Sequence, residues 1–129
     1  MILGLGTDIV SVERISKVLQ HNEGAFIDRI CSSDEKKYLQ DCSDITAKLA
    51  KLWAAKEAAV KALGTGFIEG ISFKDIELHH NRQGRPELEF KGVALQKLQS
   101  LSSHETTHIW VSLSDDKPWA QAVVIIEKI

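Results

Sequence analysis

The sequence predicts an α+β fold, and three of its features indicate this class. The stretch from Ser43 to Leu63 is rich in alanine and has apolar residues at helical spacing. The stretch from Thr107 to Glu127 instead alternates apolar and polar residues on both sides of a short turn, as a hairpin does. Helices and strands follow one another without the regular rhythm of a parallel sheet. We therefore expect an antiparallel sheet packed against one long central helix and several short helices.

The composition excludes several classes of protein. The chain has 129 residues and is 43% hydrophobic, which is ordinary for one globular domain spanning residues 1–129. A formal net charge of −2 gives no bulk attraction to nucleic acid or to an anionic membrane, so neither is an expected partner. The chain opens without a signal peptide and has no apolar run of membrane-spanning length. Two cysteines without a Cys-x-x-Cys pair exclude a disulfide framework and a zinc ribbon, and we expect a cytoplasmic location.

The first strand is expected from Ile2 to Val10. Its alternation places Asp8 on the same face as Gly4 and Gly6. Glycines inside a strand often mark the close approach of a ligand or of another backbone. Asp8 at the end of such a strand is therefore either a helix or turn cap or a metal ligand.

Helices are expected in the next part of the chain. Ser11 can cap a helix that carries apolar residues inward as far as Leu19. A short helix is expected around Phe26 to Ile30. Ser32 and Glu35 then form a capping-box pattern that opens a helix through Leu39.

Strands dominate the remainder, with one helix between them. We expect strands over Ile71–Leu78, Glu87–Phe90, Thr107–Ser114 and Trp119–Glu127, and a helix over Gly92–Leu101. The segment from His79 to Pro86 is expected to be a turn-rich connection. His79 and His80 are adjacent and would face opposite ways, so we interpret them as surface residues rather than as a metal-binding pair.

Lys56 lies in the apolar stripe of the central helix and needs an explanation. The stripe consists of Ile45, Leu49, Leu52, Ala59 and Leu63. One interpretation is that Lys56 buries its stem and extends its ammonium to water. The other is that Lys56, Glu57 and Lys61 line one polar cleft, where the carboxylate holds a hard cation and the lysines meet phosphate oxygens. Because a Glu–Lys pair four residues apart is also common on helix surfaces, the helix alone does not decide.

The chain resembles the holo-[acyl-carrier-protein] synthases over essentially its whole length. The opening Ile2–Val10 resembles the start of that family. The block from Trp53 to Ala62 is similar to the family signature aromatic-x-x-Lys-Glu-(Ala/Ser)-x-x-Lys, and Gly-Thr-Gly follows at 64–66. The sequence Gly-Arg-Pro at 84–86 resembles the family's Gly-Lys-Pro turn, and the hairpin from Val111 to Val124 matches the end of the family pattern.

The resemblance implies a 4′-phosphopantetheinyl transferase fold and activity. Such enzymes transfer the phosphopantetheine arm of coenzyme A to a serine of apo-acyl carrier protein, and they release adenosine 3′,5′-bisphosphate. The resemblance further implies a requirement for Mg²⁺, a role in fatty acid biosynthesis, and a homotrimer with each active site at a subunit interface.

The resemblance also implies roles for individual residues. Asp8 and Glu57 would be the Mg²⁺ ligands, as one or two carboxylates with substrate phosphates and waters suit this ion. Glu57, or a metal-bound water beside it, would be the base. Lys61 would contact phosphate oxygens in the transition state.

The remaining implied contacts concern the two substrates. Lys56 would lie near the site, and the backbone at Gly64 and Gly66 would approach a phosphate. Arg85 and Pro86 would border the adenine nucleotide, from the neighbouring subunit. Arg14 suits the acidic face of an acyl carrier protein.

Two positions depart from the family pattern. Many relatives have an arginine where this chain has Leu52, and we expect Lys51 or Lys48 to supply charge for the 3′-phosphate of coenzyme A. Many relatives have a histidine where this chain has Trp110. Either His108, on the same strand face two residues earlier, substitutes for it in part in binding coenzyme A, or the histidine is dispensable.

Two rival functions stay open on the sequence. A Mg²⁺-dependent pyrophosphate hydrolase could use the same carboxylates with water as the nucleophile. A binding protein without activity is the non-enzymatic alternative, which the departures at Leu52 and Trp110 allow.

Overall fold

The structure is a computed structural model, and it describes residues 1–67 and 70–129. Its elements in chain order are β1 (Ile2–Ser11), α1 (Val12–Ile30), α2 (Ser33–Gln40), α3 (Ile45–Leu63), a short 3₁₀ helix η1 (Phe73–Asp75), β2 (Ile76–His80), β3 (Pro86–Phe90), α4 (Gly92–Leu101), β4 (Thr107–Asp116) and β5 (Trp119–Lys128). The α+β class predicted from the sequence is confirmed. Among the described residues, no helix is both long and apolar enough to cross a bilayer.

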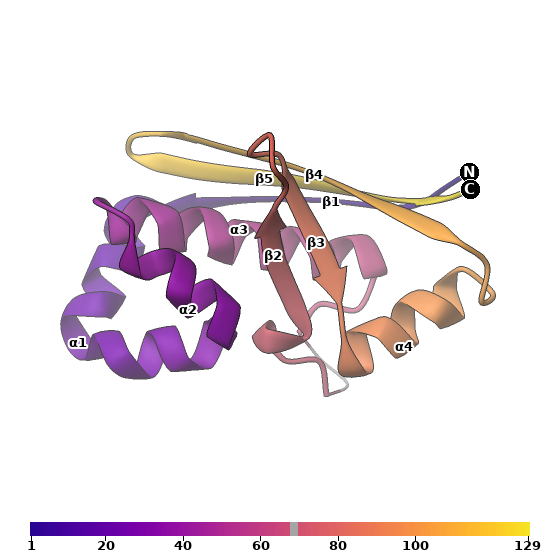
Figure 1. Ribbon diagram of the computed structural model, residues 1–129, viewed down its shortest axis with the longest axis horizontal. Helices are drawn as coiled ribbons and strands as arrows, with labels where there is room; N and C mark the ends of the chain where they lie inside the picture. The colour runs from indigo at the N-terminus through magenta and orange to yellow at the C-terminus, as the bar shows by residue number, and fades with distance from the viewer. Residues whose placement is uncertain (68–69) are drawn as a thin grey trace.

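Two antiparallel sheets frame the long helix α3. The first has the strand order β1-β5-β4, and the second is the β2–β3 hairpin. Figure 1 shows α3 running beneath the three-stranded sheet, with the hairpin crossing in front of it. Helices α1 and α2 lie together at one end of the molecule, and α4 lies at the other.

The glycine face of β1 packs directly on α3. A Cβ atom at Gly4 would lie 1.9 Å from the carbonyl oxygen of Ala62, and one at Gly6 would lie 1.9 Å from that of Ala58. Of the two explanations for these glycines, the structure therefore supports close approach of another backbone. Asp8 shares this face, so its side chain also points toward α3.

Helix α3 is buried on nearly all sides rather than along one stripe. Its alanines at 54, 55, 58 and 59 are fully buried, and small side chains let neighbouring elements approach closely. Asp44 caps its start by accepting a hydrogen bond from the amide of Ala47, and Gly64 ends it in the left-handed conformation at φ 82°. The helix predicted from Ser43 begins two residues later, at Ile45, and ends at Leu63 as predicted.

The first half of the chain follows the sequence-based prediction closely. Ser11 caps α1, and a break at Asn22 divides this helix where the sequence indicates an interruption. The capping box of Ser32 and Glu35 opens α2, with both reciprocal hydrogen bonds present.

The strand predicted over Ile71–Leu78 is shorter and lies later in the chain. Residues 73–75 form η1 because Ser72 and Asp75 make a capping box there, and β2 extends to His80. In α4, Leu95 and Leu101 are exposed. Ala94 and Leu98 make the buried contacts of this helix.

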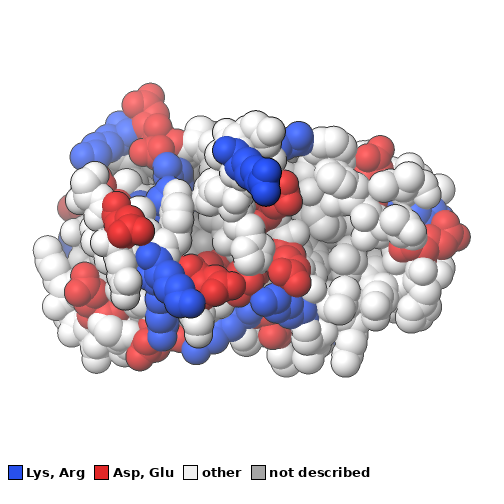
Figure 2. Space-filling model, viewed as in Figure 1, with Lys and Arg blue, Asp and Glu red and all other residues white. Residues whose placement is uncertain are grey.

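The outer face of the three-stranded sheet exposes several large apolar side chains among polar ones. Leu5, Ile125 and Trp110 lie side by side across β1, β5 and β4, pointing away from α3. Leu5 is 60% exposed, and Ile9 on the same face of β1 is 63% exposed. Charged side chains instead gather over α1, α2 and the hairpin (Figure 2). Exposed apolar side chains of this kind mark a surface for association.

We expect Gly6→Ala to destabilise the protein by about 3 kcal/mol or more, because the added Cβ would overlap the carbonyl of Ala58. Gly24→Ala is the matched control, since its Cβ would meet only Asn22 Oδ1 at 3.9 Å. Urea unfolding measures both free energies of unfolding. Equal stability of the two variants would contradict the backbone contact.

Candidate functional site

Three of the predicted site residues converge where β1 meets the second half of α3. The ammonium of Lys61 donates to the carbonyl oxygen of Thr7 at 3.0 Å and to Asp8 Oδ1 at 3.2 Å. Glu57 lies one helical turn before Lys61, on the same side of α3. The side chain of Asp8 is only 15% exposed, whereas that of Lys61 is 50% exposed. A carboxylate in a sheltered position is thus held beside a half-exposed cation.

The pKa of Glu57 is raised from its ordinary value. Partial burial is the largest cause, and the negative charge of Asp8 is the second. Lys61 and Arg14 act in the opposite direction. The two carboxylates therefore feel each other's charge, and a bound cation would relieve their repulsion.

Arg14 lies on the first turn of α1 and is exposed. It is close enough to Glu57 to lower the pKa of that carboxyl. The exposed guanidinium thus borders the acidic pair.

Lys56 does not join Glu57 and Lys61. Its side chain is fully buried, and its ammonium donates to Glu35 Oε1 at 2.7 Å and to the carbonyl oxygens of Phe73 at 2.8 Å and Ile30 at 2.5 Å. All three protons of the ammonium are used in these bonds. Neither the ammonium in water nor the shared polar cleft considered from the sequence is present, because the helix is enclosed on this side as well.

Glu35 completes this internal polar cluster. One of its oxygens accepts from Lys56 and from the amide of Ser32, and the other accepts from the amide of Leu78 at 2.8 Å. The pair thereby joins α2, α3 and β2. A contact between Lys56 and coenzyme A would require this cluster to open.

Gly64 and Gly66 form the C-terminal cap of α3. The amide of Gly64 donates to the carbonyl of Lys61, and the amide of Gly66 donates to that of Val60. Both glycines have positive φ. These amides are occupied by the helix cap, so their predicted contact with a phosphate would need the cap to rearrange.

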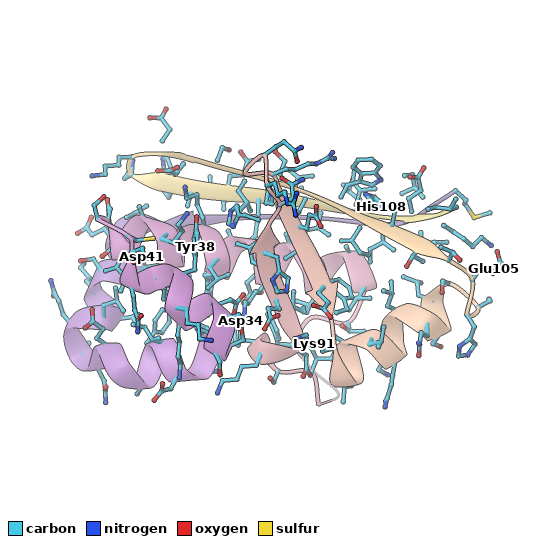
Figure 3. All side chains as sticks on the ribbon, in the orientation of Figure 1. Asp34, Tyr38, Asp41, Lys91, Glu105 and His108 are labelled. Atoms are coloured by element: carbon cyan, nitrogen blue, oxygen red, sulfur yellow. The ribbon has the colours of Figure 1, made fainter. Side chains whose placement is uncertain are left out.

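A second group of predicted residues lines a cavity of about 350 Å³ between β3 and β4. The guanidinium carbon of Arg85 lies 5.0 Å from the ring centroid of Trp110, and the ring of His108 lies 4.1 Å from the same ring. Pro86 and Glu87 also line this cavity. Figure 3 shows His108 on β4, on the side of the sheet away from α3.

The two groups of residues lie on opposite sides of α3 within one chain. Lys48 and Glu57 are nine residues apart, which is about 180° around a helix. Lys48 faces the hairpin that carries Arg85 and Pro86, and it lines a small hollow with His80 and Pro86. The sequence analysis predicted that His80 lies on the surface, whereas the structure places it half-buried in this hollow. The alternation of side chains along β2, which turns His80 away from His79, could have indicated that the two histidines have different surroundings.

A third group combines two carboxylates with His79. Ligand atoms of Glu77, His79 and Glu89 lie within 4.8 Å of one another. His79 Nε2 is 2.7 Å from Glu77 Oε1, and the ammonium of Lys91 is 3.0 Å from the same oxygen. Because Lys91 already neutralises Glu77, the group is explained as a network of ion pairs. Asp34 of α2 lies toward Lys91 in Figure 3.

An aspartate and a glutamate beside a lysine, on a strand and a helix in close contact, are groups that could hold a divalent cation and contact phosphate oxygens. Residues 4–124 match the family model of the 4′-phosphopantetheinyl transferase superfamily, and the chain belongs to that superfamily.

Within the superfamily, the chain is similar to the holo-[acyl-carrier-protein] synthases. It is 41% identical to that of Roseobacter denitrificans, over 98% of this chain and 96% of the relative. Its structure matches the crystal structure of the Neisseria meningitidis synthase with a TM-score of 0.87 at 37% identity, covering 99% of this chain and 100% of that one. The Bacillus anthracis synthase in complex with CoA (3′,5′-ADP) matches with a TM-score of 0.82 at 31% identity, covering 100% and 99%. The family resemblance noted from the motifs is confirmed.

We expect Lys56→Met to destabilise the protein by about 3–5 kcal/mol, because it leaves the buried carboxylate of Glu35 without its cation. Adding Glu35→Gln should recover part of this loss by removing the unpaired charge. Urea unfolding at one fixed protein concentration measures both. A loss below about 1 kcal/mol, the range of exposed ion pairs, would show that the buried pair is not what holds these elements together.

Proposed function

We propose that this protein transfers the 4′-phosphopantetheine arm of coenzyme A to a serine of apo-acyl carrier protein. The observation that carries the proposal is the convergence of Asp8, Glu57 and Lys61 at the contact of β1 with α3. The relatives support it, because they are named holo-[acyl-carrier-protein] synthases and several of their structures are named as complexes with CoA. We further propose a cytoplasmic location and a role in supplying carrier protein for fatty acid biosynthesis.

The donor set fits Mg²⁺. Asp8 and Glu57 offer carboxylate oxygens, which this hard cation prefers. The pKa of Glu57 is raised first by burial and then by the charge of Asp8, and a cation between the two carboxylates would offset this second cause. Asp8 and Glu57 would hold the ion. When bound, Mg²⁺ would neutralise charge on the pyrophosphate of coenzyme A.

In the reaction, the serine oxygen of the carrier forms a bond to the phosphorus that bears the pantetheine arm. The bond from this phosphorus to the bridging oxygen breaks, and adenosine 3′,5′-bisphosphate leaves with the electron pair. The proton of the serine goes to a base, for which Glu57 is the candidate because its carboxylate lies beside Asp8 and Lys61. Lys61 is exposed enough to turn from Asp8 to the phosphate oxygens and stabilise their charge.

Arg14 is the candidate contact for the carrier protein. It is exposed beside Glu57, so a carrier that docks against it would bring its serine to the acidic pair. A positive side chain at this border would attract an acidic partner and orient its approach.

We propose a homotrimer in which each active site is shared by two subunits. The exposed side chains of Leu5, Ile9 and Trp110 on the outer face of this sheet would supply a surface for association. Asp8 and Glu57 lie on the side of α3 opposite to the hairpin with Arg85 and Pro86. One coenzyme A molecule could therefore touch both groups where they belong to neighbouring subunits in a closed ring.

The transfer of phosphopantetheine to apo-acyl carrier protein tests the proposal by mass spectrometry. We expect Asp8→Asn, Glu57→Gln and Lys61→Met each to lower the rate of transfer roughly 100-fold or more, because each removes charge stabilisation at the reacting phosphate. Lys17→Met is the matched control, since its exposed side chain pairs only with Glu13 on α1 among the ion pairs found.

The same assay separates the rival functions. A hydrolase would consume coenzyme A in the absence of a carrier. A binding protein would bind coenzyme A without turnover, and Glu57→Gln would leave its affinity unchanged. No mass gain on several carriers would refute the transferase.

Mixing two inactive variants tests the shared site. Asp8→Asn and Arg85→Glu impair different halves, so subunits exchanged at equal ratio should restore about one quarter of the wild-type activity. The restored activity arises at interfaces that combine two intact halves. If each subunit holds a whole site by itself, mixing will restore nothing.

A further inference from the structure

One face of the β2–β3 hairpin concentrates side chains that bind metal ions. Successive side chains of a strand alternate between its faces, so Glu77 and His79 lie on the same face of β2. In the register of the hairpin, Glu89 lies directly opposite Glu77, and Glu87 lies directly opposite His79. Three carboxylates and one imidazole therefore share this face.

The pairing of Glu77 with Glu89 calls for a cation. Like charges directly opposite one another on adjacent strands are destabilising. The side chain of Glu77 is only 5% exposed, so water screens this repulsion poorly. Burial alone would raise the pKa of Glu77. Hydrogen bonds from Ser32 and Lys91 outweigh the burial, so the pKa is lowered and Glu77 is a carboxylate at neutral pH.

The imidazole of His79 lies between the two carboxylates. Its Nε2 is 2.7 Å from Glu77 Oε1 and 3.2 Å from Glu89 Oε1. Because Nε2 carries at most one proton, it cannot donate a full hydrogen bond to both oxygens. A metal ion bound to Nε2 and to one oxygen of each carboxylate would satisfy all three atoms.

The spacing of these three atoms suits such an ion. They lie within 4.8 Å of one another, which side-chain rotation can bring to the separation of about 3.4 Å that a tetrahedral site requires. The side chains of His79 and Glu89 are 39% and 56% exposed, so an ion has access from solvent. The remaining coordination positions would be filled by water.

The ion pairs of this group do not exclude a metal ion, because Lys91 can be replaced. Its ammonium lies 3.0 Å from Glu77 Oε1, where it acts as the cation of the group. The side chain of Lys91 is 45% exposed and starts where β3 passes into α4 (Figure 3), so it can turn to solvent. A divalent cation would bring twice the charge to the same carboxylates.

We infer that Glu77, His79 and Glu89 bind one divalent cation of the first transition series, such as Zn²⁺, which clamps β2 to β3. An imidazole ligand suits these metals, whereas Mg²⁺ prefers oxygen ligands throughout. The inference is independent of the proposed function, because it uses none of the residues to which a part in the transfer is assigned.

Calorimetric titration of the full-length protein with Zn²⁺ tests the inference. Asp8→Asn serves as the parent for this experiment, because it weakens binding of Zn²⁺ to the pair of Asp8 and Glu57. We expect one Zn²⁺ per chain. His79→Gln and Glu89→Gln should each lower the affinity at least tenfold, since the loss of a residue that merely supports a ligand already costs about this much. His21→Gln, which removes an exposed histidine of α1, is the matched control and should keep the full affinity.

Lys91→Met provides a change of the opposite sign. It removes the cation that competes for Glu77, so the affinity for Zn²⁺ should increase severalfold. Without added metal, the melting temperature of this variant should fall, because Glu77 loses its partner. Saturating Zn²⁺ should then raise the melting temperature, since the ion binds the folded chain.

Co²⁺ used in place of Zn²⁺ gives a readout that does not depend on stability. Its visible absorption bands report the ligands, so His79→Gln should change the spectrum and His21→Gln should not. An affinity for Zn²⁺ that is the same in the parent and in the His79→Gln variant would overturn the inference, as would Zn²⁺ binding that Lys91→Met weakens. Failure of the proposed function would appear elsewhere, as absence of carrier loading with Mg²⁺.

Discussion

The contact between the backbones of β1 and α3 is the constraint on which the acidic site depends. Gly4 and Gly6 have no side chains, so the strand rests on the carbonyl groups of the helix. Asp8 follows on the same face and is thereby brought to the side of α3 that carries Glu57 and Lys61. Without the glycines the strand would be displaced from the helix by the width of a side chain, and the two carboxylates would separate.

The opposite side of α3 is held in place by a buried ion pair rather than by apolar packing alone. Lys56 and Glu35 are fully or almost fully buried, yet the ammonium and both carboxylate oxygens are hydrogen-bonded. Their partners come from α1, α2, η1 and β2. A buried ion pair adds little net stability compared with apolar packing, but it is directional. It therefore fixes the rotation of α3, and with it the direction in which the next residue, Glu57, points.

Much of this arrangement could be predicted from the sequence, because local signals determine it. The caps at Ser32 and Asp44, the glycines after Leu63 and the alternation from Thr107 to Lys128 each act over a few residues. The environment of Lys56 could not be predicted in this way. Its three acceptors come from positions 30, 35 and 73, and a periodic pattern along one helix carries no information about such distant partners. The exposure of the outer face of β1 could not be predicted either, because the alternation of residues along a strand does not say which of its two faces is turned toward the core.

The uncovered face of the three-stranded sheet has a consequence for the behaviour of the isolated subunit. Leu5, Ile9 and Trp119 are each at least half exposed, beside the free edge of β1. An isolated subunit would therefore tend to aggregate with other chains through that face and edge. If the subunits associate as proposed, dilution would dissociate them, and melting temperatures measured at different protein concentrations would not be comparable.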